Sequence, residues 1–581
     1  MIRIKNQKQM ELFDPWAYLG PKRRRLLDRS WAGLFQKQIL CELPVKDFVP
    51  FFDKTFGRPT KELYTVLGVL VLQQSLDLTD EETISQIAFN TQWHYALNIT
   101  EESDTAKYMA PKTLWNMRSI AIENQLDSIL FDSIANKLAS VFKVNTDNQR
   151  LDSVHIKSNM QRLGRIRIFS NSIHKFLKNL KRAHKNIFNT IDKETIDKYF
   201  TEKSLSCFAM VKPSDSQKTL ASLSKDLFNL VQQFRTCPEV KNMNSFKLLE
   251  RVLKEQCNLN ATDNRKHSVE VKKPKEVPSD SLQNPSDPDA TYSSNKGQGY
   301  QVQIMETYTD TKDKDVKAKT LNLITHVNVE QACESDAHAL KPAIESTKEK
   351  GLAPKELEAD TLYGGDKNYE YARSQGVDLV APAKVTTNKT TNDISTFTFS
   401  NSGHVISCPE GHKPIKQKKN KNRYTQGFCA KTCSKCLSLK DCPVKPSRYY
   451  HLYYEERTMR IAKRRAYERT EEFKDRYRWR AGVEATMSEY DRRTGVKKLR
   501  VRGFKAVRFA AVLKAIGVNI FRATAVRRAV KSLNGRSCRE FFSYYGQTLF
   551  FKEQLETILM NLLQKNKLSF KKLQICNFLV C

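Results

Sequence analysis

Residues 355–368 read KELEADTLYGGDKN, and this stretch points to the kind of fold that the chain adopts. Its first six residues predict a strand that ends at Asp360. The glycine-containing run that follows predicts a turn, and a short helix is expected after the turn. A strand joined by a turn to a helix is typical of proteins in which helices pack on a sheet.

The sequence on both sides of this unit predicts further strands and helices. Strands are expected in RLDSVHI (150–156), GYQVQIMETY (299–308), LNLITHVNV (321–329) and VDLVAPAK (377–384). Residues 335–351 predict a helix with Ser335 or Asp336 as its cap and Gly351 at its end. The order of these elements predicts an α/β fold, with a mixed sheet and flanking helices.

Helical patterns dominate the remaining regions. Leu63, Leu67 and Leu70 recur at helical spacing. Thr79 and Glu82 have the spacing of a capping box ahead of a further helix. The expected regions are 1–145, an all-α N-terminal domain; 146–160 and 285–400, the sheet core; 161–284, a helical insert and linker; 401–450, a cysteine-rich insert; 451–530, the C-terminal helices of the core; and 531–581, a helical tail.

Composition indicates an anionic partner. The chain has 581 residues, with 98 Lys and Arg against 64 Asp and Glu, and a net charge of +34 at pH 7. An apolar fraction of 40% can build hydrophobic cores and excludes wholesale disorder. Such a positive surplus favours a nucleic-acid backbone as partner, with anionic lipid as the alternative.

No segment is expected to cross a membrane. The densest apolar run, residues 66–72, falls far short of the roughly 20 residues that span a bilayer. The first residues also lack the apolar core of a signal peptide. We therefore expect a cytoplasmic protein whose cysteines are reduced.

Two aspartates are expected at strands of the core. If RLDSVHI is extended, Asp152 lies on the same face as Val154 and Ile156. Asp360 ends another predicted strand. An aspartate at a strand end is often only a turn former. Carboxylate oxygens are, however, the ligands that hold divalent cations for phosphoryl transfer.

A third carboxylate, Glu484, is expected on a late helix. Val483, Met487 and Tyr490 follow one another at helical spacing and predict a buried face with Glu484 at its border. A glutamate on a helix is more often solvated than functional. Asp491, two helical turns further on, is a rival for the third position.

Several motifs resemble the DDE transposases of bacterial insertion sequences, in the subgroup with a helical N-terminal domain and a cysteine-bearing insert. The matching stretches are RPTKELYTVLGVLVLQQSLDLTDEETISQIAFNTQWHYALNI (58–99), LDSVHIKSN (151–159), SDPDATYSSNKGQGYQVQ (286–303), ELEADTLYGGDKN (356–368), RYRWRAGVEATMSEYDRRTG (476–495) and LRVRG (499–503). Together they cover most of the chain except 161–280 and the last fifty or so residues.

The resemblance implies a ribonuclease-H-like core in which Asp152, Asp360 and Glu484 are the catalytic triad and bind Mg²⁺ or Mn²⁺. It further implies cleavage of double-stranded DNA at the ends of the element and strand transfer into target DNA. A homodimer in the synaptic complex and DNA binding by the N-terminal domain are also implied.

The most specific match is the family's Tyr-x2-Arg-x3-Glu-x6-Lys signature. Tyr477, Arg480 and Glu484 fit it, whereas Asp491 stands where the family has lysine. Arg480 is expected either to contact phosphate or to pair with Glu484 within the helix. One of the two arginines after Asp491 is expected to replace the family lysine in gripping DNA. The DNA-binding residues expected in this region are Tyr477, Arg480, Arg492, Arg493, Lys497, Lys498, Arg500 and Arg502.

Two basic stretches predict phosphate contacts. Residues 457–508 hold 18 Lys and Arg against 7 Asp and Glu, a surplus that favours a surface along DNA over an ordinary solvated helix face. Residues 411–424, GHKPIKQKKNKNRY, form a second patch, which is expected to lie in a loop. Contacts of this kind position DNA without reading its sequence.

Five cysteines between residues 408 and 442 predict a structural zinc site. Cys433 and Cys436 have the two-residue gap of a zinc knuckle, and Cys442 with Cys408 or Cys429 would complete four thiolates. His412 is a substitute ligand. The family resemblance favours the set Cys408, Cys433, Cys436 and Cys442.

Two other functions are compatible with the sequence. A metal-dependent nuclease with the same core would cut DNA without joining it. A zinc-stapled DNA-binding protein, derived from a transposase and without catalysis, is favoured by Asp491 at the position of the family lysine.

Overall fold

The computed structural model describes residues 2–7, 9, 12–53, 55–200, 211–261, 267–384 and 394–534. By contacts the chain divides into two compact units, Met1–Thr524 and Ala525–Cys581. All the elements discussed below belong to the first unit, apart from the last part of its final helix. The predicted helical tail, 531–581, falls outside the described residues beyond position 534.

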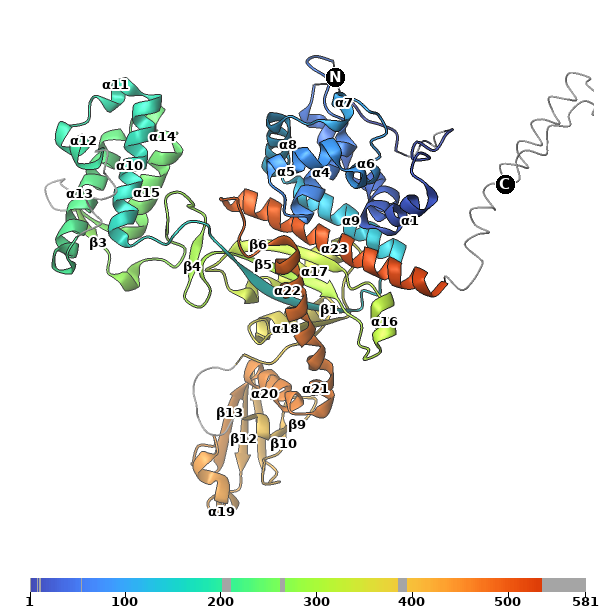
Figure 1. The fold of residues 1–581 in the computed structure, drawn as a ribbon. Helices are drawn as coiled ribbons and strands as arrows, with labels where there is room; N and C mark the ends of the chain where they lie inside the picture. Colours follow the sequence, from blue (N-terminus) through green and yellow to red (C-terminus); the bar gives the residue numbers. More distant parts are fainter. Residues whose placement is uncertain are drawn as a thin grey trace, which may run out of the picture. The chain divides into compact units, whose positions relative to one another are not determined.

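The N-terminal region is a group of helices, as the sequence patterns predict (Figure 1). The predicted apolar run forms α4, and nearly all of its residues are buried. Thr79 and Glu82 form the predicted capping box at the start of α5. The helices are α1 (Pro21–Arg29), α2 (Trp31–Leu34), α3 (Val45–Phe48), α4 (Leu63–Ser75), α5 (Asp80–Phe89), α6 (Thr91–Ala96), α7 (Asp104–Lys107), α8 (Pro111–Glu123) and α9 (Leu126–Phe142).

A six-stranded mixed sheet forms the centre of the chain. Its strands are β1 (Asn148–Lys157), β4 (Thr291–Ser293), β5 (Gly297–Thr307), β6 (Ile324–Gln331), β7 (Glu356–Ala359) and β8 (Asp378–Val380). The order is β4-β5-β1-β7-β8, and β6 also pairs with β5. β1 runs antiparallel to β5 and parallel to β7, and β7 runs parallel to β8. The predicted mixed α/β architecture is confirmed, and it is compatible with a ribonuclease-H-like core.

Helices α17 (Leu340–Glu349) and α18 (Asp366–Ser374) pack on one face of this sheet (Figure 1). Leu151 of β1 and Leu357 of β7 share a buried apolar cluster with Leu340 and Ile344 of α17. These residues point to one side because strand side chains alternate, which leaves Arg150 and Asp152 on the other side of β1. A short helix, α16 (Lys314–Lys319), precedes β6.

Residues 504–524 of the long helix α23 (Phe504–Asn534) lie against the sheet and the N-terminal helices. The Asn519 side chain donates to the backbone oxygen of Ile324 (2.9 Å) and accepts from its nitrogen (2.8 Å). Gly517 approaches α4 so closely that a Cβ atom would lie 2.7 Å from the Ser75 Cα. Among the described residues, only 504–530 form a helix that is long and apolar enough to cross a membrane. Of the apolar stretch within this helix, 83% is buried, as in a core helix.

The segment between β1 and β4 folds around a core of its own (Figure 1). The predicted helices are present as α10 (Arg165–Ala183), α11 (Lys185–Phe188), α12 (Lys193–Tyr199), α13 (Ser216–Phe234), α14 (Pro238–Lys241) and α15 (Asn244–Gln256). The stretch after them differs from the expected plain linker, because β2 (Cys257–Ala261) and β3 (His267–Val271) pair as an antiparallel hairpin.

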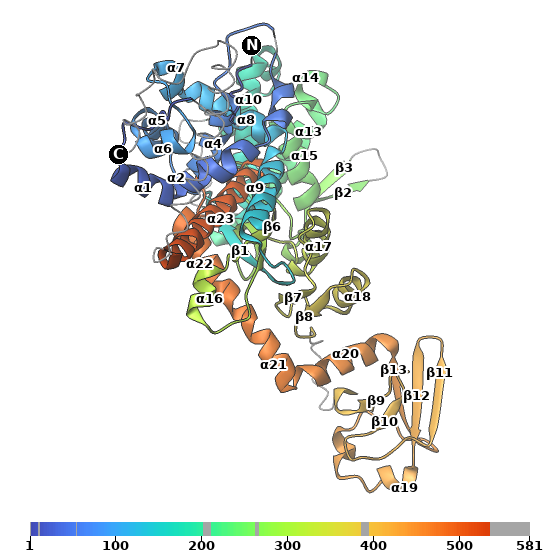
Figure 2. The ribbon, with the colours of Figure 1, turned by 90° about the vertical axis from the view of Figure 1, so that its right-hand side faces the viewer.

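The cysteine-rich region contains two small sheets and a short helix. They are formed by β9 (Thr398–Phe399), β10 (Val405–Ser407), β11 (Lys416–Asn420), β12 (Arg423–Phe428), β13 (Tyr450–Glu455) and α19 (Ala430–Cys433). The prediction of a loop for 411–424 is wrong. Most of this basic stretch lies in a tight antiparallel hairpin that β11 forms with β12. β12 then pairs with β13 to complete a three-stranded sheet (Figure 2).

The predicted C-terminal helices are separate segments. α20 (Glu456–Glu468), α21 (Glu471–Tyr477) and α22 (Gly482–Thr494) precede α23. The Thr470 side chain caps α21, and a 3-10 turn at Arg478–Ala481 leads into α22. Gly495, with a φ of 64°, ends α22 in the left-handed conformation that favours glycine.

Candidate active site

The sheet register brings Asp152 and Asp360 together. Leu151 on β1 pairs with Ala359 on the parallel strand β7, so the two aspartates are the next residues on neighbouring strands. Strands in a sheet lie roughly 4.8 Å apart, which puts the two carboxylates within electrostatic reach. The pKa of Asp152 reflects this, since the Asp360 charge is among the causes that raise it.

Asp152 is a partly buried acid whose negative charge is only partly compensated. Burial is the main cause that raises its pKa, and hydrogen bonding and the Arg480 guanidinium oppose the rise. The Ser153 backbone nitrogen donates to Asp152 Oδ1 (2.8 Å). A second acid, Asp336, adds to the negative potential at Asp152. The net result is a carboxyl group that a further cation would stabilise in its charged form.

Arg480 connects the acids of the predicted triad. Its Nη2 donates to Asp152 Oδ2 (2.8 Å), and its Nη1 lies 3.5 Å from Glu484 Oε1. The predicted pairing of Arg480 with Glu484 is present, and the guanidinium also binds Asp152 on the sheet, whereas the predicted phosphate contact stays a prediction. Its Nε is buried without a hydrogen-bond partner in the described structure. Burial lowers the pKa of Arg480, but the surrounding acids raise it by more. The pKa is therefore above its ordinary value, and the guanidinium stays charged.

Glu484 lies in the first turn of α22, at the border of its buried face. Val483, Met487 and Tyr490 are buried as predicted, whereas the Glu484 side chain is 73% exposed. Its link to Asp152 runs through the Arg480 guanidinium. The sheet register thus places Asp152 and Asp360 side by side. Glu484 approaches, from the solvent side, the Arg480 guanidinium that binds Asp152.

Arg150 fixes the start of α22 on β1, a role that the sequence did not suggest. Its Nη1 donates to the Trp479 backbone oxygen (2.8 Å), and a Cβ on Gly482 would lie 2.1 Å from the same nitrogen. Arg150 also pairs at 2.7 Å with Glu306, which is fully buried. Glu306 in turn binds Thr486 of α22 and Arg522 of α23.

Tyr477 lies at the edge of the acidic site. Its ring stacks on Phe473 with the centroids 5.5 Å apart and 15° between the planes. Burial is the main cause that raises its pKa, and Asp360 and Asp152 contribute to the rise. A packed ring beside the acids can form a wall of the site, and its hydroxyl stays protonated.

Asp491 has a local structural role. Its Oδ1 accepts from the Lys497 backbone nitrogen (3.1 Å), and its Oδ2 lies 3.7 Å from Lys497 Nζ. Seven residues of helix, roughly 10 Å, separate it from Glu484. Because Asp491 closes the loop after α22, these contacts favour Glu484 as the third acid.

The predicted DNA-binding cations differ in their surroundings. Arg492, Lys498 and Arg502 are exposed, although Arg502 also contacts the Met160 sulfur. Arg493 pairs with Glu489 at 2.7 Å, and Arg500 binds the backbone and side chain of Asp77. Arg492 is therefore the better placed of the two arginines to meet a phosphate.

The four cysteines that the family resemblance favours line one cavity. Cys408, Cys433, Cys436 and Cys442 surround a volume of about 100 Å³, together with His412, whereas Cys429 does not line it. The His412 backbone nitrogen donates to the Cys408 sulfur (3.3 Å). Burial raises the pKa of Cys433 to about 11, and the neighbouring thiols add to the rise.

Neither the three acids nor the four cysteines form a complete coordination shell. Over the described ranges, no three His, Cys, Asp or Glu side chains stand close enough together to hold an ion as they are. The donor chemistry still fits: hard carboxylate oxygens suit Mg²⁺ or Mn²⁺, and four thiols around one cavity suit Zn²⁺.

Two stretches of the chain match family models of transposases. Residues 407–524 match the family model for the transposase DDE domain, and residues 35–119 match that for a transposase domain, DUF772. No curated protein and no solved structure matched the chain. The two matches confirm the predicted resemblance to insertion-sequence DDE transposases and support a transposase function. The DDE match contains Glu484 and the clustered cysteines.

Proposed function

We propose that this chain is a DNA transposase that cuts the ends of an insertion sequence and joins them to target DNA. The observation that carries the proposal is the meeting of Asp152 and Asp360 on neighbouring strands, with Arg480 binding Asp152 and Glu484. Three carboxylates from distant parts of the sequence converge on this region, and carboxylate oxygens are the ligands that hold divalent cations for phosphoryl transfer.

Asp152, Asp360 and Glu484 would hold Mg²⁺ or Mn²⁺. The bound ion would activate the attacking oxygen and stabilise the leaving one, without a covalent protein–DNA intermediate. Arg480 limits the repulsion among the acids before DNA binds. Its unpartnered Nε–H gives it a donor for a phosphate oxygen. Tyr477 and Phe473 exclude water from one side of the acids.

Double-stranded DNA is the proposed substrate, at both the element ends and the target. The exposed cations Arg492, Lys498 and Arg502 follow Glu484 in the sequence and can contact backbone phosphates. A dimer that pairs two element ends, cytoplasmic location and DNA binding by the N-terminal helices remain predictions from the family resemblance.

A structural zinc is part of the proposal. Cys408, Cys433, Cys436 and Cys442 would bind it, and their shared cavity supports this choice over a set that includes Cys429. The ion would hold the small sheets of the insert together and would take no part in the chemistry.

Replacing Asp360 by Asn tests the proposal. Asp360→Asn removes a cation ligand but keeps the size of the side chain, so cleavage of a labelled element end with Mg²⁺ or Mn²⁺ should fall by about 1,000-fold or more. DNA binding should persist. Asp475→Asn is the matched control, because that acid is 70% exposed and pairs with Arg478.

The same assay separates the alternatives. A transposase yields joined products with labelled ends, whereas a nuclease yields cuts without joining. An unmutated protein that binds DNA and never cuts it would favour the non-catalytic binding protein and overturn the proposal.

A further inference from the structure

The three-stranded sheet of the cysteine-rich region has one face open to solvent (Figure 2). The register aligns Lys416 of β11 with Gly427 of β12 and His451 of β13. The next position on the same face aligns Lys418, Thr425 and Tyr453. Because strand side chains alternate, these residues point to one side of the sheet.

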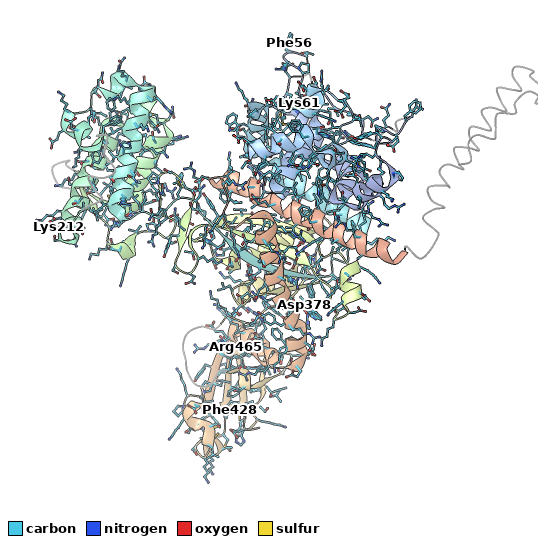
Figure 3. All side chains as sticks on the ribbon, viewed as in Figure 1. Phe56, Lys61, Lys212, Asp378, Phe428 and Arg465 are labelled. Atoms are coloured by element: carbon cyan, nitrogen blue, oxygen red, sulfur yellow. The ribbon has the colours of Figure 1, made fainter. Side chains whose placement is uncertain are left out.

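The other face of this sheet is already buried. Tyr424, Phe428, Leu452 and Tyr454 form an apolar cluster with Met459 of α20. Phe428 is labelled in Figure 3. The stability of the insert therefore depends on that cluster, whereas Tyr453, on the open face, is 41% exposed. An exposed aromatic side chain of a rigid sheet is available for a ligand.

Aromatic rings form a row along β13 on the open face. The centroids of Tyr449 and His451 lie 6.1 Å apart, and those of His451 and Tyr453 lie 5.8 Å apart. On this face the central strand beside them carries Arg423, Thr425 and Gly427. Gly427 is buried, and a Cβ there would meet the His451 ring and the Lys416 Cβ at 3.4–3.5 Å, so these two side chains flank the position.

Cations border the row of rings. Lys416 Nζ lies 4.8 Å from the centroid of the Tyr449 ring, and the Arg423 guanidinium carbon lies 5.3 Å from that of Tyr453. Lys418 is exposed between them on the same face. The face thus combines a row of aromatic rings with positive charges that lie against the two outer rings.

We propose that this open face binds single-stranded DNA, with bases stacking on Tyr449, His451 and Tyr453 and phosphates meeting Lys416, Lys418 and Arg423. Stacking on aromatic side chains beside a basic track is how proteins hold single strands without reading their sequence. Duplex DNA would use the charges alone, because its bases are stacked inside the helix. The choice of DNA over RNA rests on the proposed function.

Binding of an oligothymidylate of about 20 nucleotides to the full chain tests the proposal. Fluorescence anisotropy is measured with no divalent ion and no chelator added, so that cleavage does not interfere and bound zinc is kept. Tyr453→Leu should weaken binding of the single strand about tenfold, and adding Tyr449→Leu should weaken it about tenfold again. A duplex of the same length should bind each variant within twofold of the unmutated protein.

Three controls make the result decisive. Tyr453→Phe keeps the ring and should restore single-strand binding. Tyr371→Leu removes a partly exposed tyrosine of α18, whose hydroxyl donates to Glu345, and should leave single-strand binding unchanged. Asp360→Asn should bind the oligothymidylate normally, which separates this proposal from the catalytic one. Unchanged single-strand binding in the double leucine variant, or an equal loss of duplex binding, would overturn the proposal.

Discussion

The guanidinium of Arg480 determines how the three acids of the site can coexist. Asp152 is partly buried and has a raised pKa, so its charge depends on nearby positive groups. Arg480 supplies one through the 2.8 Å contact and also reaches Glu484. A planar group with several donors can serve two carboxylates and a phosphate at once, which an ammonium group cannot do with the same geometry.

Arg480→Lys should therefore reduce cleavage although it preserves the charge. We expect a loss of about tenfold to a hundredfold in the rate of end cleavage, with little change in the affinity for duplex DNA. The matched control is Arg478→Lys, since Arg478 is exposed and pairs with Asp475. Equal activity of the two variants would mean that Arg480 is only an intrahelical partner of Glu484.

His326 gives the central sheet an acid sensitivity. This residue of β6 is buried, its Nε2 has no hydrogen-bond partner within the described structure, and burial lowers its pKa to about 3, with the Lys350 charge adding to the effect. The unfolded chain takes up a proton below its ordinary pKa of 6.5, whereas the folded chain does not. Burial of neutral His326 therefore costs no stability above pH 6.5, and the free energy of unfolding decreases as the pH falls below this value.

Between pH 6.5 and about pH 5, His326 should lower the free energy of unfolding by about 2 kcal/mol. Urea unfolding at the two pH values measures the change, and His326→Leu should abolish this part of it. His338→Leu is the control, because His338 is 72% exposed beside Glu334. An unchanged pH dependence in His326→Leu would contradict the assignment.

At the scale of elements, the start of α22 decides where Glu484 lies. Gly482 faces Arg150 so closely that an added Cβ would lie 2.1 Å from its Nη1. Arg150 cannot move freely, since it also binds Trp479 and the buried Glu306. Displacement of this guanidinium would therefore shift the helix turn that carries Glu484.

Gly482→Ala should destabilise the fold by about 1–3 kcal/mol and reduce cleavage by more than that loss of folded protein explains. Thermal unfolding and end cleavage, measured on the same preparation, give the two values. Gly164→Ala is the matched control, because nothing lies within 4 Å of the added carbon there. Wild-type cleavage in Gly482→Ala would show that the position of α22 is not critical.

The cysteine cavity makes a prediction at the same scale. The purified protein should contain one zinc ion per chain, and Cys433→Ser should lose it, because Cys433 lines the cavity with three other thiols. Cys429→Ser should keep the metal, since Cys429 does not line the cavity. Elemental analysis of the three proteins decides between them, and zinc lost equally from both variants would contradict the chosen ligand set.

Local patterns predicted the strands and helices that depend on neighbouring residues. The alternation around Asp152, the strand before Asp360 and the buried face of α22 could all be read from the sequence. The β11–β12 hairpin was missed because lysines dominate it. The alternation of Tyr424, Gln426 and Phe428, all buried, was the signal that could have revealed it.

Contacts between distant segments could not be predicted from the sequence. Arg150, Glu306 and Arg522 come from three distant segments, and nothing in their local sequence announces a buried ion-pair network. Arg480 was predicted to face either Glu484 or phosphate, but its stronger contact with Asp152 depends on how α22 packs on β1. Such partners depend on tertiary packing and need the folded structure to be seen.

For the whole molecule, charge and matches to known families agree. A net charge of +34 suits a chain that handles DNA, and the two transposase matches lie on either side of the first two aspartates of the proposed triad. Asp152 and Asp360 fall outside both matched ranges. Their part in the site rests on the sheet register and on their coupling to Arg480.

Metal-directed cleavage of the polypeptide tests whether the three acids meet at one ion. Fe²⁺ replaces Mg²⁺ in the presence of ascorbate and peroxide, and mass spectrometry locates the breaks in the chain. The account predicts breaks close to residues 152, 360 and 484 that disappear together in Asp360→Asn. Breaks near 152 and 360 without any near 484, or breaks that persist in Asp360→Asn, would contradict it.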